Sequence, residues 1–144
     1  MIDGEADGQH DIDDAVRFAN KILKSSEMVI FGSRSLGAST GMPIVKKYVI
    51  KLAVFITRWL TNLEITDTHN GLKAFKRSAL PFLKCDIRGF GFESEMLKRI
   101  ITHDLSFCEL SCHLRYTTYS RKKGQKLSNA LKIVEDLFFW WGKS

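Results

Sequence analysis

Apolar side chains recur at helical spacing in three long stretches of the chain. The first runs from Ile12 to Leu23 and follows acidic residues that favour a helix start. The second covers residues 43–62 and begins at a proline, which suits the first turn of a helix. The third covers residues 93–103 and begins with glutamates, which the helix dipole favours at that end. These patterns predict three helices.

Shorter apolar segments lie between these stretches and predict strands at residues 27–32, 72–76 and 105–116. In the last segment alternate side chains share one face: Cys108, Leu110, Cys112, Leu114 and Tyr116. This pattern predicts that the two cysteines act as small core residues. A turn cluster at 66–71 and a short helix at 78–83 complete this part. We therefore expect an α/β fold with a mixed sheet, forming a single domain over residues 1–144.

The predicted helix over residues 43–62 combines an apolar surface with basic side chains along one side. The basic residues are Lys46, Lys47, Lys51 and Arg58. Such a helix suits a membrane interface, although a core helix with one solvated side has a similar pattern. A last predicted helix, over residues 127–144, carries a Phe-Phe-Trp-Trp run that suits either lipid headgroups or a protein partner.

Composition narrows the class of partner. The chain has 144 residues, 44% of them hydrophobic, and a net charge of +6, which favours an anionic partner. Its three cysteines lack C-x-x-C spacing and are expected to be free thiols in a reducing compartment. Met1 runs directly into acidic residues, so we expect no secretory signal.

Candidate metal ligands gather near the start of the chain. Glu5 and Asp7 point the same way on an extended backbone, and Gln9 lies just past a glycine turn. These oxygen ligands suit Mg²⁺ or Mn²⁺. Two alternatives remain open. One is a solvated acidic turn, and the other is a calcium loop over residues 3–14, which lacks an entering helix and ends in Asp14 instead of glutamate.

Two basic segments are candidates for phosphate binding. Arg34 follows the strand over residues 27–32, beside Gly32, where a guanidinium can meet phosphate or remain a solvated loop residue. The glycine-containing segment 35–42 is a candidate lid. The basic run over residues 121–126 is either an anion clamp or a solvated charge run. We expect Arg34 and Arg121 to lie outside the core.

Four motifs occur in order along the chain: Glu-Ala-Asp-Gly-Gln-His-Asp, Gly-Ser-Arg after a strand, Asp-Thr-His-Asn-Gly-Leu-Lys-Ala-Phe, and Gly-Phe-Gly-Phe-Glu-Ser-Glu-Met-Leu. Together they resemble family 2 glycosyltransferases of the GT-A fold, most closely the dolichol- or polyprenyl-phosphate sugar synthases. The resemblance covers nearly the whole chain. It implies inverting transfer of a sugar from a nucleotide-diphosphate sugar to a polyprenyl or dolichyl phosphate.

The resemblance also implies roles for matched residues. The metal, Mg²⁺ or Mn²⁺, would be held by Glu5, Asp7 and Gln9. The residues implied in catalysis are Asp7, Arg34, Glu95 and Arg121. Those implied in substrate binding are Gln9, Lys47, Lys51, Asp67, Gly71, Lys73, Gly124 and Lys126. Residues 43–62 would form the interfacial helix that meets the lipid phosphate, which implies a peripheral protein on the cytoplasmic side of a membrane.

Three departures from the family pattern shape this hypothesis. Glu5 stands where the family usually has aspartate, and the loop at 121–126 is one residue short and lacks a serine. The family's nucleotide-binding half has no counterpart here, so the chain resembles the C-terminal, metal and acceptor part of a GT-A domain, and a separate N-terminal half would complete it. The hypothesis includes no nucleic-acid partner. The alternatives are a non-catalytic basic module that binds anionic lipid or nucleic acid, and a calcium-binding loop protein.

Overall fold

The structure is a computed structural model that describes residues 1–4, 10–68, 70–85 and 91–116. Several predicted features lie outside these residues. They are the proposed metal ligands Glu5, Asp7 and Gln9, the predicted helix over residues 127–144, and the basic-loop residues Arg121, Gly124 and Lys126.

The main sheet has four strands in the order β1-β4-β2-β5. Their bounds are Ile2–Asp3 for β1, Lys73–Phe75 for β4, Val29–Ser33 for β2 and Phe107–Ser111 for β5. β4 is antiparallel to both β1 and β2, whereas β2 and β5 are parallel. The sheet is therefore mixed, as the sequence predicts.

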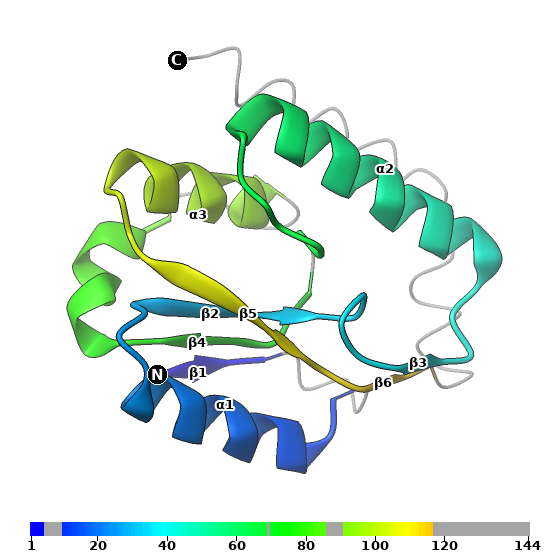
Figure 1. Ribbon diagram of the computed structural model, residues 1–144, viewed down its shortest axis with the longest axis horizontal. Helices are drawn as coiled ribbons and strands as arrows, with labels where there is room; N and C mark the ends of the chain where they lie inside the picture. The colour runs from blue at the N-terminus through cyan, green and yellow to red at the C-terminus, as the bar shows by residue number, and fades with distance from the viewer. Residues whose placement is uncertain (5–9, 69, 86–90, 117–144) are drawn as a thin grey trace.

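Helices cover both faces of this sheet (Figure 1). α1, Ile12–Lys24, lies on one face, and α3, Gly91–Thr102, lies on the other together with the 3₁₀ helix η1, Arg77–Leu83. Alternation along β2 divides its side chains between two cores, because neighbouring residues of a strand point to opposite faces. Val29 and Phe31 pack with α3, while Ile30 packs with α1. The chain is thus a mixed α/β fold.

The ends of the helices follow local sequence signals. Asp11 caps α1, and its side chain accepts a hydrogen bond from the backbone N–H of Asp13. α2, Ile44–Thr61, follows Pro43 and ends at Asn62, whose φ of 55° is left-handed. The expected helix at 78–83 is the 3₁₀ helix η1, which contains a proline.

The strand expected over residues 105–116 is interrupted, so that prediction is wrong in its extent. β5 ends at Ser111, and the chain resumes as β6, Leu114–Arg115, which pairs in parallel with β3, Ser39–Thr40. The candidate lid segment 35–42 therefore contains a paired strand. The alternation itself is confirmed, since the five predicted side chains all belong to the core beside α1: Cys108, Leu110, Cys112, Leu114 and Tyr116.

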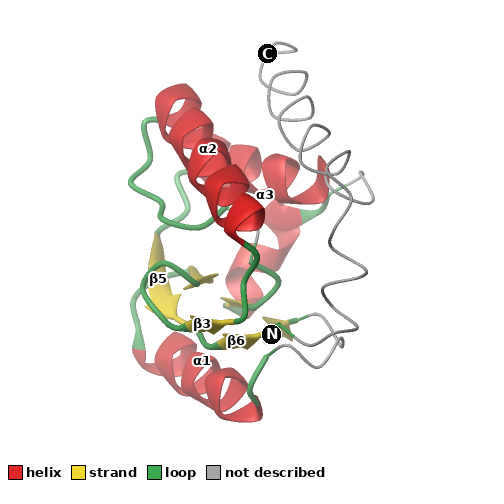
Figure 2. Ribbon diagram, turned by 90° about the vertical axis from the view of Figure 1, so that its right-hand side faces the viewer, coloured by secondary structure: helices red, strands yellow, loops and turns green. Residues whose placement is uncertain are grey.

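α2 lies on the same side of the sheet as α3 (Figure 2). Only Ala53, Ile56 and Thr57 of this helix are buried. Large apolar side chains on it are more than half exposed: Ile44, Val45, Tyr48, Leu52, Phe55 and Trp59. Within the described part of the chain, no helix combines the length and apolar character needed to cross a bilayer.

Candidate functional site

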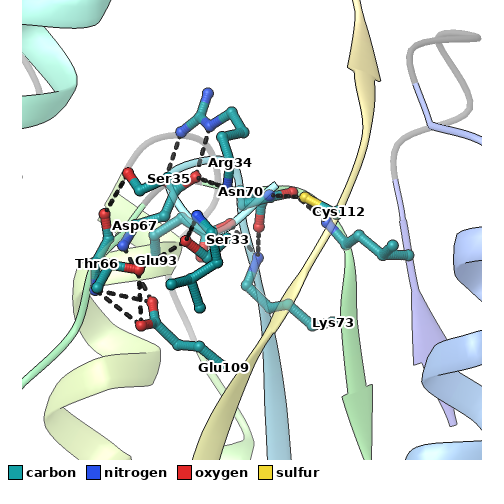
Figure 3. Close-up of polar contacts among 12 residues, drawn as sticks. Ser33, Arg34, Ser35, Thr66, Asp67, Asn70, Lys73, Glu93, Glu109 and Cys112 are labelled. Atoms are coloured by element: carbon teal, nitrogen blue, oxygen red, sulfur yellow. Dashed lines mark hydrogen bonds and ion pairs between the residues drawn. The ribbon is translucent and has the colours of Figure 1, made fainter. Parts of the chain in front are cut away.

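The centre of the candidate site is a buried ion pair between Arg34 and Asp67. Arg34 follows the last residue of β2, and Asp67 lies in the loop between α2 and β4. The Arg34 Nε donates to Asp67 Oδ2 at 2.6 Å, and Nη2 donates to Oδ1 at 2.6 Å. The Arg34 backbone N–H also donates to Oδ2 at 3.0 Å, so the carboxylate holds both the side chain and the main chain of Arg34 (Figure 3).

Burial corrects the expectation that Arg34 lies outside the core. Arg34 is 8% exposed and Asp67 is 1% exposed. Burial by itself would lower the pKa of the Arg34 guanidinium, but the hydrogen bonds and charge of Asp67 outweigh it and raise this pKa above its ordinary value. Arg34 is therefore a permanently charged group, and Asp67 provides the countercharge that its burial requires.

Glu109 of β5 supports the loop that contains Asp67. Its carboxylate accepts the backbone N–H of Thr66 at 2.9 and 3.0 Å and that of Asp67 at 3.1 Å. It also accepts the Thr66 hydroxyl at 2.8 Å. The Thr66 hydroxyl lies 2.6 Å from that of Ser33, so the loop is joined to the end of β2 as well.

Tyr116 connects this cluster to α2. Its hydroxyl lies 3.4 Å from Arg34 Nη1, and the Lys46 Nζ lies 4.7 Å from the centre of its ring. Lys46 belongs to the first turns of α2. A tyrosine that is 6% exposed thus has two cations beside it, one at its hydroxyl and one over its ring face.

A second polar group lies beside β4. Lys73 is 1% exposed, and its ammonium group donates to the Asn70 carbonyl and to Glu93 Oε1, both at 2.7 Å. The Asn70 side chain contacts the Cys112 Sγ at 2.7 Å. Burial raises the pKa of the Cys112 thiol to about 11. Asn70 and Glu93 therefore hold the Lys73 ammonium group in place.

The remaining predicted residues are distributed as follows. Glu95 is buried on α3, and Arg99 donates to it at 2.8 and 3.1 Å. Gly71 is half-buried just before β4, while Lys47 and Lys51 are exposed on α2. Arg58, expected among the surface cations of that helix, donates from Nε to the Ile65 carbonyl at 2.7 Å.

The structure brings together Arg34 and Asp67, which the sequence motifs suggested separately. It adds three residues without a predicted site role: Thr66, Glu109 and Tyr116. Glu109 carried a sequence signal, because it is an acid inside an apolar strand segment, on the face opposite Cys108 and Leu110. Among the residues with described positions, no group of three or more His, Cys, Asp or Glu side chains could hold a metal ion.

Comparisons with known proteins identify relatives of the chain. It is 33% identical over 133 residues to the UDP-N-acetylglucosamine–dolichyl-phosphate N-acetylglucosaminyltransferase of Methanococcus voltae. The aligned residues cover 90% of this chain and 53% of that protein. It is 28% identical over 138 residues to an uncharacterized protein of Methanocaldococcus jannaschii, covering 93% of this chain and 57% of that protein.

No protein-family model matches the chain, and the search of solved structures gives no significant match. The chain spans about half the length of the curated relatives it matches. It is therefore related to a dolichyl-phosphate glycosyltransferase and corresponds to a part of that protein.

Proposed function

We propose that this chain is the metal and acceptor part of a family 2, GT-A glycosyltransferase. The reaction is metal-dependent, inverting transfer of a sugar from a nucleotide-diphosphate sugar to a polyprenyl or dolichyl phosphate. The part of the Methanococcus voltae protein that this chain does not match would correspond to the nucleotide pocket. The sequence relationship to the Methanococcus voltae enzyme supports the reaction class.

The observation that carries the proposal is the position of Arg34. The Asp67 carboxylate accepts hydrogen bonds from the Arg34 Nε and Nη2, and Nη1 lies 3.4 Å from the Tyr116 hydroxyl. Asp67 also fixes the plane of the group, which matters because phosphate is bound by a fork of two N–H groups.

The surface of α2 supports a lipid as the carrier of that phosphate. Its exposed apolar residues include Tyr48, Leu52, Phe55 and Trp59, spaced so that they share one side of the helix. Exposed Lys47 and Lys51 flank this side. The first turns of the same helix place Lys46 against Tyr116, which contacts Arg34. Lys46 thus links α2 to the cluster around Arg34, and a prenyl chain lying on the exposed side of α2 would have to place its phosphate around the start of the helix to reach it.

The chemistry requires little from a general base. A lipid phosphate is already ionised near neutral pH, so it can attack the anomeric carbon directly, and one displacement inverts that carbon. Arg34 would hold the acceptor phosphate in line, which lowers the entropic part of the barrier. A divalent metal at Glu5, Asp7 and Gln9 would neutralise charge on the leaving diphosphate.

Farnesyl phosphate binding tests this proposal, because the probe is a water-soluble prenyl monophosphate. We expect the chain to bind it in calorimetry and to bind farnesol far more weakly. Arg34→Lys should weaken binding about ten-fold, since a bidentate contact is lost. Arg17→Lys is the matched control, because Arg17 also pairs with a carboxylate, Asp14, but on α1.

Two results would contradict the proposal. One is equal affinity for farnesyl phosphate and farnesol, which would remove the role of the phosphate. The other is an equal loss of affinity in Arg17→Lys and Arg34→Lys, which would show that the cluster around Arg34 has no special part in binding.

A further inference from the structure

We infer that Glu109 is a positioning residue, which acts through Asp67 to hold the Arg34 guanidinium in the orientation that phosphate binding needs. This inference rests on the proposed function for the effect on ligand binding. Glu109 has no counterpart among the sequence motifs, and it lies on β5, far along the chain from both residues of the ion pair.

The location of Glu109 follows from the register of the sheet. Glu109 pairs with Phe31 across the parallel β2·β5 ladder, so their side chains point to the same face. Phe31 on this face packs in the core that contains Ile65, at the start of the loop carrying Asp67. The Glu109 carboxylate on that face therefore lies within hydrogen-bond distance of the loop backbone.

The contacts of Glu109 are directed at backbone groups. Both of its oxygens accept the Thr66 N–H, at 2.9 and 3.0 Å, and Oε1 also accepts the Asp67 N–H at 3.1 Å. A buried loop leaves its N–H groups without partners unless a side chain supplies an acceptor. Because Glu109 fixes the amide of Asp67, it also fixes the direction of the Asp67 side chain.

The loop is further restrained by hydroxyl groups. Thr66 Oγ1 donates to Glu109 Oε2 at 2.8 Å and lies 2.6 Å from Ser33 Oγ. Ser35 donates from its hydroxyl to the Thr66 carbonyl at 3.1 Å. Ser33 and Ser35 flank Arg34 in sequence, so hydrogen bonds join the loop to the chain on both sides of Arg34 (Figure 3).

Glu109→Gln tests the inference with nearly unchanged shape. The glutamine NH₂ group donates and cannot accept, so at either oxygen position it would face an N–H or O–H donor. The first measurement is the ¹⁵N–¹H signal of the Arg34 Nε–H in the full chain, identified by its loss in Arg34→Lys. We expect Glu109→Gln to shift or broaden this signal.

The second measurement is the affinity for farnesyl phosphate, arranged as a double-mutant cycle. Glu109→Gln should weaken binding about ten-fold in the wild-type background, because the Arg34 fork is misplaced. In the Arg34→Lys background the same change should have an effect of less than about two-fold, because the residue through which it acts has been removed.

Asp14→Asn provides the matched control. Asp14 is also a buried carboxylate that accepts a backbone N–H, from His113 at 2.6 Å, and it pairs with Arg17. It should lower stability without changing the Arg34 signal or the affinity. Should Glu109→Gln fail to fold, Thr66→Val removes one hydrogen bond to Glu109 and should produce a smaller shift of the same signal.

The outcomes separate the inference from the proposed function. An unchanged Arg34 signal in Glu109→Gln would overturn the positioning role. An affinity loss of the same size with and without Arg34 would also overturn it, because the effect would not act through Arg34. Absence of farnesyl phosphate binding by the wild-type chain would overturn the proposed function, and the Arg34 signal would still decide the positioning role.

Discussion

Asp67→Asn should be strongly destabilising, because it leaves a buried guanidinium without its countercharge. The carboxylate accepts three hydrogen bonds from Arg34, two of them at 2.6 Å, and Asp67 is 1% exposed while Arg34 is 8% exposed. Breaking a buried ion pair from one side typically costs about 3–5 kcal/mol. The free energy of unfolding of a domain is roughly 5–15 kcal/mol, so this is a large fraction of it.

The matched comparison is Asp14→Asn, which also removes a buried carboxylate. Its partner Arg17 has a side chain that is 41% exposed, so water can replace the lost contact. Asp14 also accepts the backbone N–H of His113, and an asparagine oxygen can still accept that bond. We therefore expect Asp14→Asn to cost about 1 kcal/mol, well below the cost of Asp67→Asn.

Urea unfolding of the full chain, followed by circular dichroism, measures both variants. The difference should appear as a lower midpoint with an unchanged slope, which indicates a change in stability and not in the denatured state. Replacing both partners, as Arg34→Met with Asp67→Leu, should recover much of the loss, because no charge is then buried unpaired. The reasoning is refuted if Asp67→Asn and Asp14→Asn lower the midpoint equally.

Four further predictions concern other parts of the chain. Trp59→Ser should reduce binding to anionic vesicles, measured by sedimentation, whereas Leu23→Ser, at a more exposed site on α1, should not. Equal losses would contradict an interfacial role for α2. Gly37→Ala should destabilise the fold in thermal unfolding, because its Cβ would lie 2.1 Å from the Cys112 carbonyl oxygen, and an unchanged melting temperature would show that the backbone adapts. Cys112 should resist labelling by iodoacetamide at pH 8, as detected by mass spectrometry. Burial raises its thiol pKa to about 11, so only about one thiol in a thousand is ionised at that pH. Rapid labelling in the folded state would count against this. Asp7→Ala should abolish Mn²⁺-dependent binding of a nucleoside diphosphate, measured by calorimetry on this chain. Unchanged binding would reject the metal assignment.

Local patterns in the sequence predicted the four described helices and the strands β2, β4 and β5, but not the two-residue strands β1 and β3. Periodicity and end signals are properties of neighbouring residues, so the Asp11 cap of α1 and the proline start of α2 could be recognised without any knowledge of the fold. The same patterns could not foresee that the strand after Leu105 breaks at Ser111. That break depends on the pairing of β6 with β3, a segment more than seventy residues earlier in the chain.

Sequence motifs indicated which residues are candidates for a phosphate site, but only the folded chain shows which of them come into contact. The Gly-Ser-Arg and Asp-Thr motifs predicted Arg34 and Asp67 as site residues, but their ion pair joins positions 33 residues apart. Glu109 contacts the same loop from 42 residues away, through the register of β5 on β2. Such contacts depend on how strands align and on which groups become buried. Neither property is local, so a pattern of neighbouring residues does not predict them.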